Sequence, residues 1–245
     1  MNIGIFGDSW GCGVWGDVED EWNERFKAYW ASFPKEADEL ERRMSQFGIV
    51  HLGIHHYLWK NAGHQVINHS QPGINNAGTL WRLKRYHKDF NINIVIVTEP
   101  FRDFHWRPDL YDSNKTFKQN CEQLVDAQLK EIEILCGESC IVVGGCHKIS
   151  KNYNFMHTVN WCELIDSSVD WPVYYAQPGH IGQKLKQNEI IINGPKIKEV
   201  LLDEEAFDRH YQITRDLWDK YFTRCGHPNK LGHEILYKEI QRVIS

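Results

Sequence analysis

Two segments at opposite ends of the chain carry residues that could act together as a nucleophile and a base. Ser9 follows the apolar run IGIF (residues 3–6) and closes the tripeptide Gly-Asp-Ser. A serine hydroxyl is a weak nucleophile unless a base removes its proton. His227, in the segment CGHPN (225–229), could be that base, because an imidazole gains and loses protons near neutral pH. Together they could attack an acyl carbon.

The pattern of apolar residues predicts the elements that would position this pair. Apolar, β-branched runs predict strands at 2–7, 65–69, 92–98, 140–145 and 172–176. Helical patterns lie between and after them, at 35–46, 50–62, 75–88, 117–136, 158–166, 206–223 and 230–243. This alternation predicts an α/β fold, a three-layer α/β/α sandwich around a mainly parallel sheet of about five strands. Such sheets bind ligands at the carboxyl ends of their strands, where Ser9 follows the first.

A glycine and an asparagine predict where two of these helices end and begin. Gly63 predicts the end of the helix before the second strand. Asn229 predicts the amino-terminal cap of the last helix, which would leave His227 on the loop just before it.

The length of the chain fits one domain. Its 245 residues are a common size for a single α/β domain, and the sequence has no internal repeat or linker. We therefore expect one domain over 1–245, with inserted segments near 14–48 and 177–205. Loops of this kind would lie over the carboxyl edge of the sheet and influence the choice of substrate.

The composition excludes several classes of protein. A formal net charge of −5 argues against general nucleic-acid binding, which usually needs a basic surface. The first residues show no secretory signal, no apolar run is long enough to span a membrane, and the seven cysteines are odd in number. We expect a soluble, cytoplasmic protein with reduced thiols. Ten Trp, ten Tyr and eleven Phe would suit contacts with carbohydrate rings, although most such rings belong to cores.

Three segments together resemble the motifs of the SGNH, or GDSL-type, hydrolases. They are GDS (7–9), VINHSQPGINN (66–76) and HPNKLGH (227–233), and they occur in the family's order. The resemblance implies an SGNH-type, flavodoxin-like sandwich and hydrolysis of an ester. It implies Ser9 as nucleophile, His227 as base, and the backbone N–H groups of Ser9 and Gly73 as donors to the oxyanion. No cofactor is expected.

Each of these residues also has a purely structural interpretation. Ser9 could cap a helix at the strand-to-helix turn, and His227 could be an ordinary loop histidine. Gly73 follows a proline in a typical type II turn. Asn75 could reach the site or cap the next helix, as could its neighbour Asn76. His233 is interpreted as structural, because it falls on the last helix.

The end of the third strand departs from the family pattern. The family has an asparagine there that donates to the oxyanion, whereas this chain has TEPFRD (98–103). Glu99 falls near the matching position, but a carboxylate only accepts hydrogen bonds. Thr98 or Arg102 could replace the amide, and Arg102 is the better donor and could also bind an anionic substrate. Alternatively, Glu99 and Arg102 could form a local ion pair.

A second departure concerns the acid that orients the histidine. The family has an aspartate three residues before it, and this chain has Arg224. A cation beside His227 would lower the pKa of the imidazole. Asp219, on the preceding helical segment, could take the place of the missing acid. A backbone carbonyl could also orient the ring, which would leave a Ser–His dyad.

The histidines raise the question of a metal. His51 and His55 are four apart, with His56 beside them, a spacing that can bind zinc on a helix. No third ligand lies nearby, so we expect no metal site.

The sequence thus predicts an SGNH-type serine esterase or O-deacetylase acting on a small-molecule or carbohydrate ester. Two alternatives remain. One is a non-catalytic binding module with the same fold, and the other is an acyltransferase with the same Ser/His pair.

Overall fold

The computed structural model describes residues 1–13, 53–98, 100–115, 117–145, 149, 152–165, 220–221 and 227–245. The inserted segments predicted at 14–48 and 177–205 lie outside these residues. So do the helix at 35–46, the strand at 172–176 and nearly all of the helix at 206–223.

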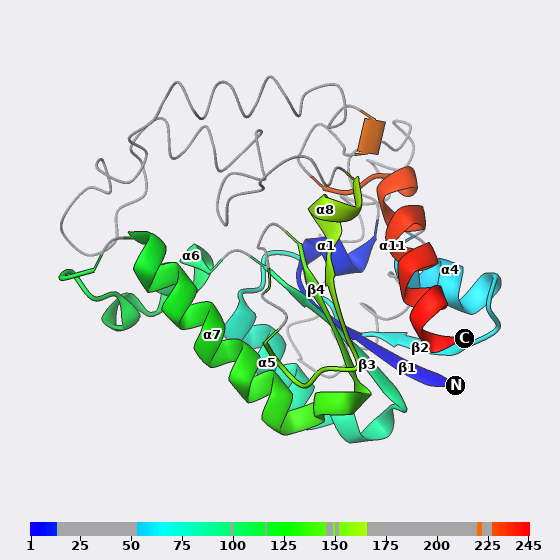
Figure 1. Cartoon of the computed structure of the whole chain (residues 1–245), viewed down its shortest axis with the longest axis horizontal. Coiled ribbons are helices and arrows are strands. Elements are labelled where there is room, and N and C mark those ends of the chain that lie inside the picture. Colours follow the sequence, from blue (N-terminus) through cyan, green and yellow to red (C-terminus); the bar gives the residue numbers. More distant parts are fainter. Residues whose placement is uncertain are drawn as a thin grey trace, which may run out of the picture.

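A five-stranded parallel sheet forms the centre of the molecule (Figure 1). Its order is β2-β1-β3-β4-β5, and every neighbouring pair is parallel. This is the flavodoxin-like order, in which the first strand lies inside the sheet. The α/β fold class predicted from the sequence is therefore confirmed. The strands are β1 (Asn2–Phe6), β2 (Gln65–Asn68), β3 (Ile92–Val97), β4 (Cys140–Gly144) and β5 (His157–Asn160).

Helices cover both faces of the sheet, which explains why its central strands are buried and mostly apolar. All six residues of β3 are buried, as expected for a strand with helices on either side. Successive side chains point to opposite faces, so Ile94 and Val95 enter different cores. The longer helices are α4 (Ile54–Lys60), α5 (Asn76–Tyr86), α7 (Phe117–Cys136) and α11 (Lys230–Ile244), and the shorter ones α1 (Ser9–Cys12), α6 (Phe101–Trp106) and α8 (Trp161–Ile165).

The two cores have different helices above them (Figure 1). On one face, α5 and α7 contribute Leu83, Val125 and Leu129 to a core that includes Phe6. On the other face, α4, α8 and α11 cover a core that contains Ile5, with Leu58, Trp161 and Leu236 among its members. Short 3₁₀ turns at His87–Asp89, Pro108–Leu110 and Gly137–Ser139 join the remaining elements.

The ends of two helices follow their predicted signals. Gly63 has a positive φ of 70° just beyond α4, which ends at Lys60. Asn229 caps α11, and its side chain accepts hydrogen bonds from the N–H groups of Leu231 and Gly232 at 2.9 and 3.1 Å. This cap leaves His227 on the loop before the helix, as predicted.

Gly232 lets the first turn of α11 approach another backbone segment closely. A Cβ atom at this position would lie 2.6 Å from the carbonyl oxygen of Tyr221. On the other side, Trp161 donates its indole N–H to the carbonyl of Gly232 at 2.9 Å. These contacts place the start of α11, and with it the loop of His227, against its neighbours.

The structure differs from the predicted secondary structure in two places. A helix was expected over 158–166, but residues His157–Asn160 form β5, and the helix is limited to α8. Val159 is buried and β5 pairs with β4, so pairing along the open edge of β4 decides this segment. Helix α6 was not predicted at all. It begins after Pro100, whose φ of −65° already suits a helix.

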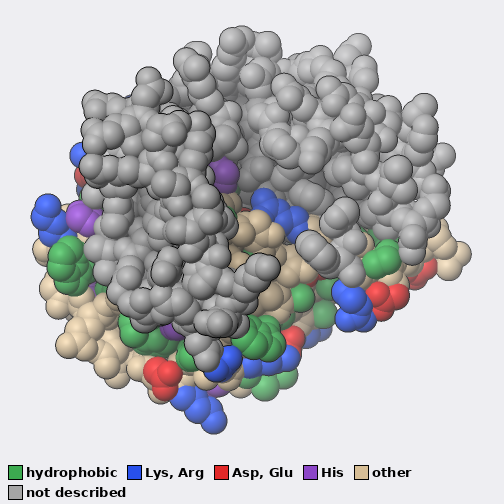
Figure 2. Space-filling model, turned by 180° about the vertical axis from the view of Figure 1, so that it is seen from behind, with side chains coloured by type: hydrophobic (Ala, Val, Ile, Leu, Met, Phe, Trp, Pro, Cys, Tyr) green, Lys and Arg blue, Asp and Glu red, His purple; other side chains and the backbone are tan. Residues whose placement is uncertain are grey.

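The surface carries both signs of charge. On the face shown in Figure 2, Lys and Arg side chains lie beside Asp and Glu side chains over the described surface. This mixture fits the small net charge of the chain. Within the part of the chain that the structure describes, no helix is long and apolar enough to cross a membrane.

Candidate active site

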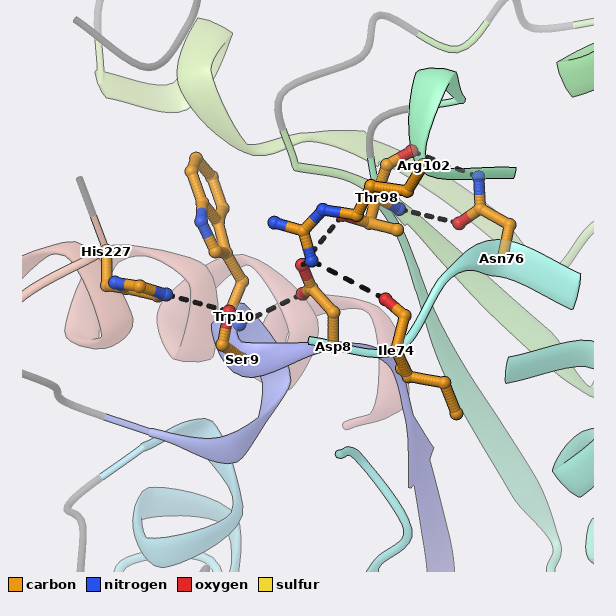
Figure 3. Close-up of polar contacts among 8 residues, drawn as sticks. All are labelled: Asp8, Ser9, Trp10, Ile74, Asn76, Thr98, Arg102 and His227. Carbon is orange, nitrogen blue, oxygen red and sulfur yellow. Dashed lines mark hydrogen bonds and ion pairs between the residues drawn. The ribbon is translucent and has the colours of Figure 1, made fainter. Parts of the chain in front are cut away.

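Ser9 and His227 are hydrogen-bonded to each other at the carboxyl edge of the sheet. Ser9 is the first residue of α1, directly after β1, and His227 comes from the loop before α11. Their Oγ and Nε2 atoms are 2.7 Å apart, although 218 positions separate them in the sequence (Figure 3). A nucleophile and its base need this contact before a proton can pass between them. Ser9 is buried and His227 is half-buried.

Asp8 braces the turn that presents Ser9. Its side chain caps α1 by accepting the N–H of Trp10 at Oδ1, at 2.9 Å. Its other oxygen accepts a hydrogen bond of 2.7 Å from the Thr98 hydroxyl and lies 3.3 Å from Nη1 of Arg102. These contacts give Asp8 a structural role in the turn. Because Asp8 is the cap, the alternative that Ser9 itself caps the helix is wrong.

Gly73 lies in the type II turn predicted for Pro72 and Gly73. Its φ is +73°, and the N–H of Ile74 donates to the carbonyl of Gln71 at 3.3 Å across the turn. Such a φ strongly favours glycine at this position. The N–H of Gln71 in turn donates to the carbonyl of Gly7 at 2.9 Å, so the loop lies directly beside the turn of Ser9.

A buried arginine that the sequence analysis missed holds this loop from behind. Arg82, on α5, donates from Nη1 to the carbonyl of His69 at 3.0 Å and from Nη2 to the side chain of Gln71. His69 itself is stacked on Tyr86, with ring centroids 4.6 Å apart. A charged residue on the inner face of the predicted helix was the sequence signal, because arginine is rarely buried without partners.

The two asparagines after Gly73 have structural roles. Asn75 caps α5 through a 3.0 Å hydrogen bond from the N–H of Gly78 to its side chain, which confirms the capping alternative. Asn76 is buried, and its amide pairs with both backbone groups of Thr98, at 2.8 and 3.0 Å. Its amide N–H also donates to Gln128 at 3.1 Å. Asn76 therefore anchors the end of β3.

The candidates after β3 have different outcomes. The hydroxyl of Thr98 donates to Asp8 at 2.7 Å, and its suggested part in the oxyanion hole stays a prediction. Glu99 lies outside the described residues, and its suggested ion pair with Arg102 stays a prediction. Arg102 extends from α6 toward Asp8 and Ile74 (Figure 3).

Asp103 is a buried carboxyl group that the sequence analysis did not single out. It accepts the N–H of Ala77 at 3.0 Å and the side-chain amide of Gln128 at 3.1 Å. Burial raises the pKa of Asp103 from its ordinary value, while these two hydrogen bonds oppose the shift. Gln128 gave a usable signal, because it interrupts the apolar stripe of α7 between Val125 and Ile132.

Asp219 is the residue proposed to orient His227, and Arg224 occupies the position where the resemblance implies an aspartate. Asp219 and Arg224 both lie outside the described residues, so the identity of the orienting group stays a prediction.

The histidines considered as metal ligands are only partly within the described residues. His51 lies outside the described residues, and Nδ1 of His55 lies 3.1 Å from the side-chain nitrogen of Asn68. Among the described residues, no three His, Cys, Asp or Glu side chains come together in a way that could hold a metal ion.

Comparisons with known proteins found likenesses of structure only. No family model matches the chain, and no curated protein matches it. Among solved structures, an α/β hydrolase from the metagenome of Lake Arreo, Spain, is 12% identical with a TM-score of 0.44, covering 99% of this chain and 94% of that one. An acetyl xylan esterase is 10% identical with a TM-score of 0.44, covering 100% of both chains.

A lipase/acylhydrolase from Enterococcus faecalis is 15% identical, with a TM-score of 0.38 and coverage of 100% of this chain and 95% of that one. The strand order and the position of Gly-Asp-Ser after β1 are those of the SGNH-type α/β fold that the sequence resemblance predicts.

Proposed function

We propose that this protein is a serine hydrolase of the SGNH type, which cleaves an ester through an acyl-enzyme on Ser9. The hydrogen bond of 2.7 Å between Ser9 Oγ and His227 Nε2 carries the proposal. Two residues from opposite ends of the chain meet where an open α/β sheet binds its ligands.

In the first half of the reaction, Ser9 Oγ forms a bond to the carbonyl carbon while its proton passes to Nε2 of His227. The electron pair of the carbonyl moves to the oxygen, which becomes an oxyanion. The backbone N–H groups of Ser9 and Gly73 are the proposed donors to this oxygen. When the oxyanion collapses, the ester C–O bond breaks and the leaving alcohol takes the proton from His227.

In the second half, water takes the place of the alcohol. His227 removes a proton from water as the water oxygen bonds to the acyl carbon, whose carbonyl oxygen again becomes an oxyanion. When this oxyanion collapses, the bond between Ser9 Oγ and the acyl carbon breaks, and Ser9 Oγ takes the proton from His227. The products are the free acid and the regenerated serine. The proposed substrate is an ester of a small molecule or a carbohydrate, in line with the sequence analysis.

The test is hydrolysis of p-nitrophenyl acetate and butyrate, together with covalent labelling by a fluorophosphonate. We expect Ser9→Ala to abolish labelling and to lower kcat by about 10³-fold or more, because the nucleophile is lost. Ser245→Ala is the matched control. The hydroxyl of this exposed serine donates to the carbonyl of Gln241 at the end of α11, so its variant should keep both activities. Turnover that survives in Ser9→Ala, or a wild-type protein that neither turns over nor labels, would contradict the proposal.

A further inference from the structure

We propose that Arg102 is a further catalytic residue, whose guanidinium group donates a hydrogen bond to the oxyanion formed at Ser9. The inference rests on the proposed function, since it concerns the same reaction. It selects one donor from the several that the sequence left open after β3.

The position of one guanidinium nitrogen is the first observation. Nη1 of Arg102 lies 3.3 Å from Oδ2 of Asp8 and 3.5 Å from the carbonyl oxygen of Ile74 (Figure 3). Asp8 immediately precedes Ser9, and Ile74 immediately follows Gly73. A single nitrogen therefore contacts the direct neighbours of both proposed backbone donors, which places the guanidinium beside the space where their N–H groups would converge.

The neighbouring polar side chains are committed to other partners. The hydroxyl of Thr98 donates to Asp8, and the amide of Asn76 is shared between Thr98 and Gln128. A guanidinium has five N–H donors in a planar fork. One of its nitrogens can therefore hold Asp8 and Ile74 while another serves an oxygen next to Ser9.

The backbone that carries Arg102 is held in place from below. Asp103, the next residue, is buried and accepts hydrogen bonds from Ala77 on α5 and from Gln128 on α7. These contacts join α6 to two longer helices, so Arg102 projects from a fixed support. The side chain of Arg102 is only 20% exposed. Donors that are fixed before the reaction stabilise a developing charge without a cost of reorganisation.

The charge balance favours an effect on the transition state over an effect on substrate binding. Asp8, with a side chain only 2% exposed, is paired with Arg102 in the resting protein. A neutral ester brings no charge for the guanidinium to bind before the reaction. The guanidinium would gain most when the oxyanion develops, and interactions of that kind raise kcat rather than lower KM.

The experiment compares Arg102→Met, Arg102→Gln and Arg102→Lys with the wild type on p-nitrophenyl acetate. We expect Arg102→Met to lower kcat by about 10²–10³-fold while KM changes by less than about threefold. Added guanidinium or methylguanidinium ion should restore part of the kcat of Arg102→Met. Arg102→Gln and Arg102→Lys keep an N–H donor and should retain more activity than Arg102→Met.

Arg107→Met is the matched control. Arg107 follows α6 directly, but its side chain is 60% exposed and pairs with Asp109 at 2.7 Å. This variant should match the wild type. Thermal melting of each variant shows whether it is folded, and if Arg102→Met fails to fold, the KM-against-kcat split in Arg102→Gln and Arg102→Lys decides.

Several outcomes would overturn the inference. One is a folded Arg102→Met whose kcat stays within about threefold of the wild type. Another is a rise in KM with kcat unchanged, seen only with esters that carry a carboxylate, which would make Arg102 a substrate-binding residue. If Ser9→Ala is inactive while Arg102→Met is active, only this inference fails. If Ser9→Ala remains active, the proposed function fails and the inference with it.

Discussion

Two histidines of the same short segment, His227 and His233, have opposite environments. His227 lies half-buried on a loop with its Nε2 atom 2.7 Å from Ser9 Oγ. His233 lies in the first turns of α11, is 0% exposed, and packs edge-on against Trp161 with ring centroids 5.1 Å apart. Burial lowers the pKa of His233 to about 3, because the charged imidazolium is poorly tolerated in the core.

The contrast shows that two histidines of one motif can differ completely in burial, which decides whether the imidazole can carry a charge. A general base has to accept a proton and carry its charge during the reaction. His233 is held neutral and contributes packing. His227 is hydrogen-bonded to Ser9 and is half-buried, which suits it to the proposed proton transfer.

The largest expected effect is on catalysis at His227. His227→Ala should lower kcat by about 10²–10⁴-fold, because Ser9 loses its base. The free energy of unfolding should change by no more than about 0.5 kcal/mol, since the ring is only half-buried. Ester turnover and urea denaturation measure the two quantities. An unchanged kcat would remove the distinction between the two histidines.

The next effect is on stability at His233. His233→Ala should lower the free energy of unfolding by about 2–4 kcal/mol, because it leaves a cavity beside Trp161 and Leu236. At temperatures where the variant is folded, kcat should remain close to that of the wild type. A stable variant with a strongly reduced kcat would instead give His233 a part in the chemistry.

The effect that is smallest over a single pH unit is a pH dependence of stability that belongs to His233 alone. Its pKa is about 3 in the folded protein, against an ordinary value of 6.5. Between these values the unfolded chain binds a proton that the folded protein does not. The free energy of unfolding should therefore fall as the pH falls through this window, with a slope approaching ~1.4 kcal/mol per pH unit.

The comparison protein for this measurement is His233→Leu, which cannot titrate at this position. Glu239 and the other carboxyl groups titrate alike in both proteins, so the difference between the two pH profiles isolates His233. Parallel profiles from pH 6.5 down to pH 4 would show that His233 becomes charged in the folded state.

Local patterns predicted much of the fold. The helix at 117–136 was predicted with the bounds that α7 has, because its apolar residues recur at helical spacing over five turns. The first four strands were predicted to within a residue, since each contains β-branched apolar residues and three of the four are largely buried. Gly63 and Asn229 were identified as helix-end residues, because the hydrogen bonds and backbone angles at a helix end involve residues close together in the sequence.

The errors occur where distant contacts outweigh local preference. Residues 157–160 form a strand because β4 offers them an edge to pair with. Helix α6 is held by Asp103, whose partners Ala77 and Gln128 come from two other helices. Arg82 is buried because it has the carbonyl of His69 to bind. Each of these partners lies at least 13 positions away in the sequence from the residue that it stabilises.

The sequence by itself determined the alternation of strands and helices, the residue types of a nucleophile and a base, and the turn that requires Gly73. These depend on side-chain type and backbone preference within a few residues. Only the tertiary structure decided that Ser9 meets His227, that Asp8 pairs with Arg102, and that His233 is buried. These contacts join segments far apart in the chain, and they form because burying the two apolar cores brings the carboxyl end of β1 beside that of β3 and beside the loop before α11.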